Sequence, residues 1–178
     1  MKYEPRMRII TALALVLYFA SVLIVPVIYQ KQSHLFFSVT SALFIICYYY
    51  WASVPIFIKS SITGAKNASW FAVASLAFTL VMIGLTALSR VFDATNLGMT
   101  AGLINIGGSL AVLGLLITLY LGSKSLTLNI DSKDHDESSR FKDVLISFAR
   151  FLLFPLFFLR IFTDVRRFDQ SFRDGRVV

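Results

Sequence analysis

Residues 97–122 read LGMTAGLINIGGSLAVLGLLITLYLG and contain no Asp, Glu, Lys, Arg or His. A helix rises about 1.5 Å per residue, so about 20 apolar residues cross a hydrocarbon core about 30 Å thick. Three more stretches have this character: IITALALVLYFASVLIVPVIY at 9–29, LFFSVTSALFIICYYYWASVPIFI at 35–58 and WFAVASLAFTLVMIGLTAL at 70–88. The sequence therefore predicts an all-α, polytopic membrane protein, with a four-helix transmembrane domain over residues 1–122.

The composition agrees with a membrane protein and offers little for catalysis. Hydrophobic residues make up 57% of the 178 residues and charged residues 15%, whereas soluble domains carry about 25% charged residues. One cysteine and two well-separated histidines exclude a disulfide framework and the usual zinc motifs. No phosphate-binding loop, Gly-x-Ser-x-Gly motif or paired intramembrane carboxylate occurs in the sequence. We therefore predict a non-enzymatic protein without a catalytic, cofactor or metal site.

The basic residues indicate the orientation in the membrane. With four spans, fifteen of the 17 Lys and Arg residues fall on one side, and only Lys31 and Arg90 fall on the other. Because short cytoplasmic loops carry an excess of Lys and Arg, both termini are predicted to be cytoplasmic in a plasma (inner) membrane protein. The net charge of +7 then reflects topology and attraction to anionic headgroups, and no direct nucleic-acid contact is expected.

The end of the second span carries a run of aromatic residues, Tyr48 to Trp51. Such runs are typical of the interfacial belt at the membrane surface. This pattern favours a second span that stops near Trp51. Residues 52–58, which include Pro55, would then lie at the membrane surface.

The chain after the fourth span divides into a polar linker at 123–140 and an amphipathic module at 141–178. A fifth span would place Arg150 and Arg160 in hydrocarbon, at about 2.5–3.5 kcal/mol each on insertion scales. The helical periodicity instead predicts two amphipathic helices joined at Pro155. Helical spacing lets Asp164 meet Arg160 and Arg167, and lets Asp169 meet Arg166 and Arg173.

The broad aromatic face of this module requires burial. One interpretation places the helix pair on the bilayer surface, with its arginines among the headgroups. The other makes it a docking surface for a cytoplasmic protein partner. The residues predicted to contact the partner or the membrane surface are Phe158, Phe162, Arg166, Arg167, Phe168 and Phe172.

Small and polar residues mark the faces through which the spans are expected to pack, since helices in lipid associate through close backbone approach and interhelical hydrogen bonds. The fourth span carries two such faces, which predict a homo-oligomer through Gly98, Gly102, Asn105, Gly107, Ser109 and Gly114. One face is expected to pack inside the subunit and the other between subunits. The third span contributes Ser75 and Thr79. The alternative function is a small channel or pore lined by Ser75, Thr79, Asn105 and Ser109.

This layout of four spans, cytoplasmic ends and an amphipathic tail resembles the small membrane subunits of bacterial two-component anti-phage systems such as Kiwa. The resemblance covers the whole chain as a topology pattern. It implies a plasma-membrane homotetramer that senses phage-induced disturbance of the membrane and is bound by a soluble, DNA-binding effector subunit. From the sequence we expect a membrane subunit that recruits or regulates a cytoplasmic partner through its tail.

Overall fold

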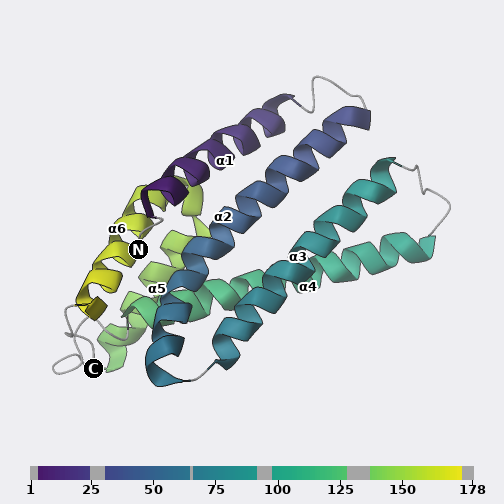
Figure 1. The fold of residues 1–178 in the computed structure, drawn as a ribbon. Coiled ribbons are helices and arrows are strands. Elements are labelled where there is room, and N and C mark those ends of the chain that lie inside the picture. The colour runs from purple at the N-terminus through teal and green to yellow at the C-terminus, as the bar shows by residue number, and fades with distance from the viewer. Residues whose placement is uncertain (1–3, 25–30, 65, 92–97, 128–136, 174–178) are drawn as a thin grey trace. The chain divides into compact units, whose positions relative to one another are not determined.

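The computed structural model describes residues 4–24, 31–64, 66–91, 98–127 and 137–173. These residues form helices and no strand (Figure 1). The helices are α1 (Glu4–Ile24), α2 (Lys31–Thr63), α3 (Asn67–Val91), α4 (Gly98–Thr127), α5 (Glu137–Leu152) and α6 (Phe154–Arg173). The predicted all-α fold is confirmed.

Four of the helices, α1 to α4, are long and apolar enough to cross a membrane. Their apolar segments run over Arg6–Leu23, Leu35–Ser61, Asn67–Ser89 and Gly102–Thr127. Each overlaps a predicted span, so the four-span prediction is confirmed by helix length and composition. Pro26 lies outside the described residues.

The helix of the second span does not end near Trp51, and the membrane boundary predicted there stays a prediction. α2 continues to Thr63 with Pro55 inside it. Pro55 lacks the N–H that would bond to the carbonyl of Trp51, but its fixed φ suits a helix, and transmembrane helices tolerate such a gap where neighbouring groups compensate. The aromatic run is also not a lipid-facing belt, because the side chains of Tyr49 and Trp51 are each only 1% exposed.

A short turn connects α2 to α3. Gly64 has a φ of +68° and donates its N–H to the carbonyl of Ser60 over 3.0 Å. Glycine adopts this left-handed conformation at little cost, and one such residue commonly ends a helix. The hydroxyls of Ser60 and Ser69 lie 3.4 Å apart, so the last turn of α2 and the first turn of α3 contact each other.

α4 extends through residues 123–127 of the predicted linker. Ser123, Ser125 and Thr127 are compatible with the helix because each hydroxyl donates to the carbonyl four residues earlier, over 2.8, 2.8 and 3.1 Å. Residues 128–136 of the linker lie outside the described residues.

The chain forms two compact units whose boundaries fall inside helices. Unit 1 comprises residues 1–48 and 74–114, and unit 2 comprises residues 49–73 and 115–178. The C-terminal module is therefore not a separate unit, because it shares unit 2 with parts of α2, α3 and α4.

Unit 1 packs through aromatic and small polar contacts. Tyr18 of α1 stacks on Phe44 of α2 with ring centroids 4.7 Å apart. One turn away, the Thr40 hydroxyl donates to the Ser21 hydroxyl oxygen over 2.9 Å. A buried hydroxyl pair of this kind joins two helices without leaving a polar group unsatisfied.

Candidate functional site

The C-terminal module, α5 and α6, is a helical hairpin with a sharp turn. The N–H of Leu153 donates to the Ala149 carbonyl over 3.0 Å, and the N–H of Leu156 donates to the Leu153 carbonyl over 2.9 Å. Pro155 follows the first residue of α6, where its missing N–H costs no helical hydrogen bond. The prediction of two helices joined at Pro155 is confirmed.

Trp51 of α2 anchors this hairpin. Its ring lies 5.3 Å from that of Phe162 and 6.4 Å from that of Phe158, both at steep edge-to-face angles. Phe154 continues the cluster, with its ring 5.6 Å from that of Phe158. Edge-to-face aromatic pairs contribute about 0.5–1.5 kcal/mol beyond burial of their area. Part of the aromatic face of α6, Phe158 and Phe162, is thus covered by the chain's own second helix.

Further contacts fix the hairpin within unit 2. The ring of Tyr120 on α4 lies 6.5 Å from that of Phe148 on α5. α4 also crosses α2 closely, because a Cβ placed on Gly122 would collide with the carbonyl oxygen of Ala52. Neither Gly122 nor Ala52 was predicted, since a single glycine at the end of an apolar run forms no periodic pattern.

Asp164 connects the two helices of the hairpin by charge. Arg150 of α5 donates to its Oδ2 over 3.1 Å, and Arg160 lies 3.6 Å from its Oδ1. The Arg160 contact was predicted from helical spacing. The Arg150 contact was not, because Arg150 and Asp164 lie on different helices. The predicted contacts of Arg173 lie outside the described side chains.

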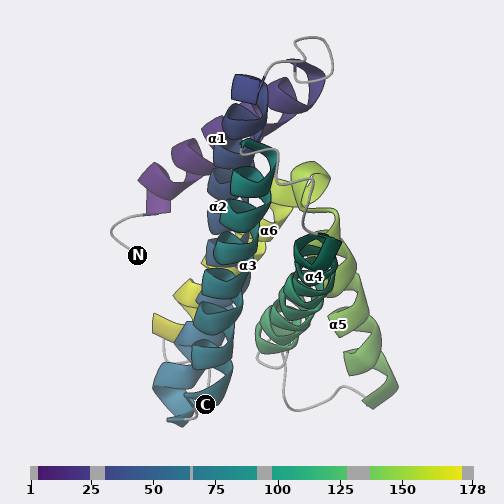
Figure 2. The ribbon, with the colours of Figure 1, turned by 90° about the vertical axis from the view of Figure 1, so that its right-hand side faces the viewer.

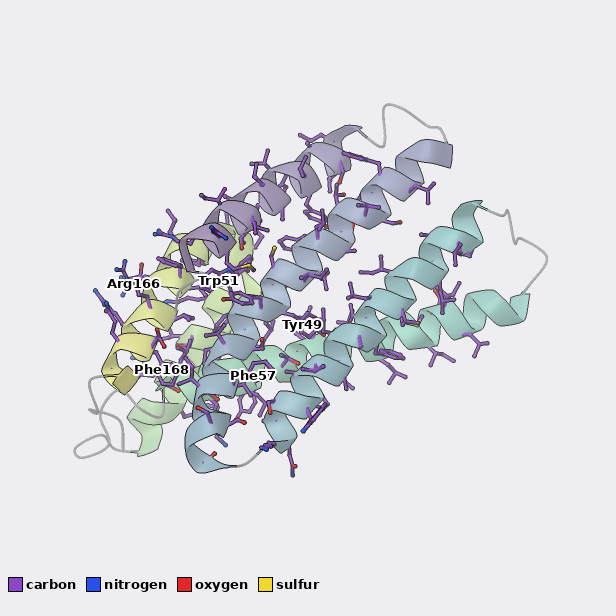
Figure 3. The ribbon with its side chains drawn as sticks, in the orientation of Figure 1. Tyr49, Trp51, Phe57, Arg166 and Phe168 are labelled. Carbon is purple, nitrogen blue, oxygen red and sulfur yellow. The ribbon has the colours of Figure 1, made fainter. Side chains whose placement is uncertain are left out.

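The residues predicted to dock a partner divide into two groups. Phe162 and Phe168 are buried, at 4% and 3% exposure, and Phe158 is half-buried against Trp51. Arg166 and Arg167 are exposed. Figure 3 places Arg166 on the outer side of α6 and Phe168 on its inner side. The docking role remains a prediction, but Phe158 and Phe162 already have an intramolecular partner in Trp51. The side chain of Phe172 is not among those that the structure describes.

The residues predicted to pack an oligomer also divide, by helix face. Gly107 and Gly114 face α3 in unit 1, where an added Cβ would collide with Met82 and Ser75 respectively. Gly102, Asn105 and Ser109 are exposed, and a Cβ on Gly102 would meet nothing within 4 Å. The surroundings of Gly98, at the start of α4, lie outside the described side chains. One small-residue face is therefore used inside the subunit, and the other remains for the predicted oligomer.

The polar residues predicted to line a pore are not brought together. Ser75 and Thr79 are buried, at 8% exposure each, and the Thr79 hydroxyl donates to the Ser75 carbonyl over 2.8 Å. Asn105 and Ser109 lie on the exposed face of α4, and the Ser109 hydroxyl donates to the Asn105 carbonyl over 3.0 Å. The hydroxyls of Thr79 and Ser109 are satisfied within their own helices, as in ordinary helix packing.

Groups able to support metal chemistry are scarce in the part of the chain that the structure describes. Within it, no three His, Cys, Asp or Glu side chains lie close enough to hold a metal ion. The candidate site is therefore the hairpin and its exposed surfaces. Comparison of the chain with protein-family models, curated proteins and solved structures gives no match.

Proposed function

We propose that this chain is a non-enzymatic scaffold of the plasma membrane, which assembles with copies of itself and recruits a cytoplasmic protein to the basic end of α6. The observation that carries the proposal is the packing of Phe162 on Trp51. Because this contact holds α6 against α2, the exposed Arg166 and Arg167 are displayed on a folded unit. A fixed cluster of charge favours a partner with a complementary acidic surface.

Assembly is proposed to use the exposed face of α4. Asn105 lies seven residues after Gly98, about 10 Å into the helix. An exposed amide in a membrane span is costly in lipid unless it finds a hydrogen-bond partner. The same face of a second copy supplies one, because a two-fold interface brings identical residues together.

The orientation supports a cytoplasmic partner. With both termini on the inner side, the α2–α3 turn and the C-terminal end of α6 also lie there, as the distribution of Lys and Arg predicts. The resemblance in layout to anti-phage membrane subunits makes a soluble effector, encoded next to this chain, the first partner to test.

The test is a photocrosslinking amino acid placed at Arg167 in intact cells, with the same probe at Leu159 as the matched control. Both positions are exposed on α6. The proposal predicts a crosslink from position 167 to the product of the neighbouring gene, and loss of that crosslink when Arg166→Glu is added. Position 159 is expected to give no such product. Equal crosslinking from both positions, or none from position 167, would overturn the recruitment proposal.

A further inference from the structure

The turn of the α5–α6 hairpin carries a concentrated apolar surface. Leu156 is 80% exposed, Leu159 68%, Leu152 51% and Leu153 47%. Monomeric soluble proteins rarely expose so many adjacent large apolar side chains. These side chains therefore require an apolar environment.

Contacts with the membrane spans indicate how deep the hairpin lies. Trp51, which contacts Phe158 and Phe162, is inside the apolar segment Leu35–Ser61. Lys59, the next charged residue on α2, follows Trp51 by eight residues, or about 12 Å. The middle of α6 is therefore level with hydrocarbon-spanning residues of α2.

A second contact places α5 beside an apolar, span-length segment as well. Phe148 meets Tyr120, inside the apolar segment Gly102–Thr127 of α4. Lys124 follows Tyr120 by four residues, or about 6 Å. Both arms of the hairpin thus lie beside membrane-spanning residues.

The turn of the hairpin lies away from the α2–α3 turn. In both ribbon views the junction of α5 and α6 lies at the opposite end of the hairpin from the α2–α3 turn (Figures 1 and 2). The exposed Arg166 and Arg167 lie toward the other end of α6.

The charges near the turn are compatible with a position in the membrane. Arg150 and Asp164 form an ion pair over 3.1 Å, and charged groups inside a membrane are typically paired with one another. Arg160 also contacts Asp164, and its long side chain can extend toward the headgroups while its stem stays in apolar surroundings.

From these observations we infer that α5 and α6 form a re-entrant hairpin, whose turn at residues 152–159 enters the hydrocarbon layer from the side of the α2–α3 turn and returns to it. The partner of the exposed leucines is the acyl chains of the bilayer. The backbone of the turn keeps hydrogen-bond partners, as hydrocarbon requires, because the N–H groups of Leu153 and Leu156 donate to the carbonyls of Ala149 and Leu153. This differs from a helix pair lying flat on the surface and from a fifth span, which would carry the C-terminus across.

Depth-dependent quenching tests this inference. Single-cysteine variants in a Cys47→Ala background carry an environment-sensitive fluorophore at the exposed positions Leu156, Phe141 or Gln170. The full-length protein is reconstituted in phosphatidylcholine–phosphatidylglycerol vesicles with bromine at different depths in the acyl chains. Phe141 is the matched control, since it is apolar and 62% exposed but lies near the start of α5.

The inference predicts that the label at 156 is quenched most by bromine deep in the acyl chains and resists aqueous iodide. Labels at 141 and 170 are expected to respond most to shallow bromine or to iodide. Equal, shallow quenching at all three positions would overturn the hairpin in favour of a flat interfacial pair. Strong iodide quenching at 156 would overturn it, because the turn would then lie in water. Neither result depends on recruitment at Arg167, so the two proposals fail separately.

Discussion

Arg150 of α5 donates a hydrogen bond from its Nη1 to Oδ2 of Asp164 on α6, over 3.1 Å and across the turn that separates the two helices. The pair is partly exposed, at 31% and 22% of the two side chains. This ion pair joins the two arms of the hairpin, and its residues are not those that contact Trp51. The hairpin is therefore held closed by charge and held to α2 by aromatic packing.

We expect Asp164→Asn to destabilise the hairpin by about 1–2 kcal/mol, since a charge-assisted hydrogen bond is lost but its partner Arg150 is only partly buried. Arg150→Gln is expected to cost a similar amount, and the double variant little more. Arg160→Gln is the control, because Arg160 is 55% exposed and 3.6 Å from Asp164. Thermal unfolding followed by tryptophan fluorescence measures these differences. Additive losses from Asp164→Asn and Arg150→Gln would show that the pair is not coupled.

The two tryptophans provide a matched pair for the aromatic anchor. Trp51 is 1% exposed and Trp70 is 69% exposed. Trp51→Ala should cost about 3–5 kcal/mol, as expected for a buried aromatic residue cut to alanine, and should make the α6 segment sensitive to protease. Trp70→Ala should leave both the unfolding midpoint and the protease pattern nearly unchanged. If the two variants behave alike, Trp51 does not anchor the hairpin.

Gly122 should tolerate no side chain. An added Cβ would meet backbone of Ala52, which cannot move aside as a flexible side chain does, so Gly122→Ala is expected to cost about 1–3 kcal/mol. Gly84→Ala is the control, because nothing lies within 4 Å of a Cβ at that position. The same unfolding measurement applies. A stable Gly122→Ala protein would contradict the close crossing of α2 and α4.

The two small-residue faces of α4 should respond differently to bulk. Gly107→Leu is expected to disturb the subunit itself, because Met82 occupies the space. Gly102→Leu and Asn105→Leu are expected to lower the oligomer mass in mild detergent while the subunit stays folded. Gly84→Leu, on the exposed surface of α3, controls for added bulk. An unchanged mass for both Gly102→Leu and Asn105→Leu would remove α4 from the oligomer interface.

Topology can be tested separately from packing. Reporters fused at Met1 and Val178 should both read cytoplasm, and one inserted at Lys31 should read the outer side, because of the distribution of Lys and Arg. An external Val178 would contradict both the orientation and the re-entrant hairpin.

The sequence was sufficient to predict the helices, since long apolar runs and the 3.6-residue period of the tail are local properties. It did not reveal what covers the tail. Phe162 signals a need for burial, but its partner Trp51 lies far away in the chain. Trp51 itself fitted a lipid-facing belt equally well, because aromatic residues near the end of a span suit either setting. Which small-residue face of α4 meets α3 also depends on tertiary contacts such as that of Gly107 with Met82.

The central claim is that the tail folds back on the membrane helix α2 through Trp51. The most direct test is a double-mutant cycle of Trp51→Ala and Phe162→Ala, with the free energy of unfolding as the measured quantity. Trp51→Ala combined with Leu159→Ala is the control, since Leu159 is 68% exposed on α6. The account predicts that the losses from Trp51→Ala and Phe162→Ala are non-additive by about 0.5–1.5 kcal/mol, and that the losses in the control pair add. Additive losses from Trp51→Ala and Phe162→Ala would contradict it.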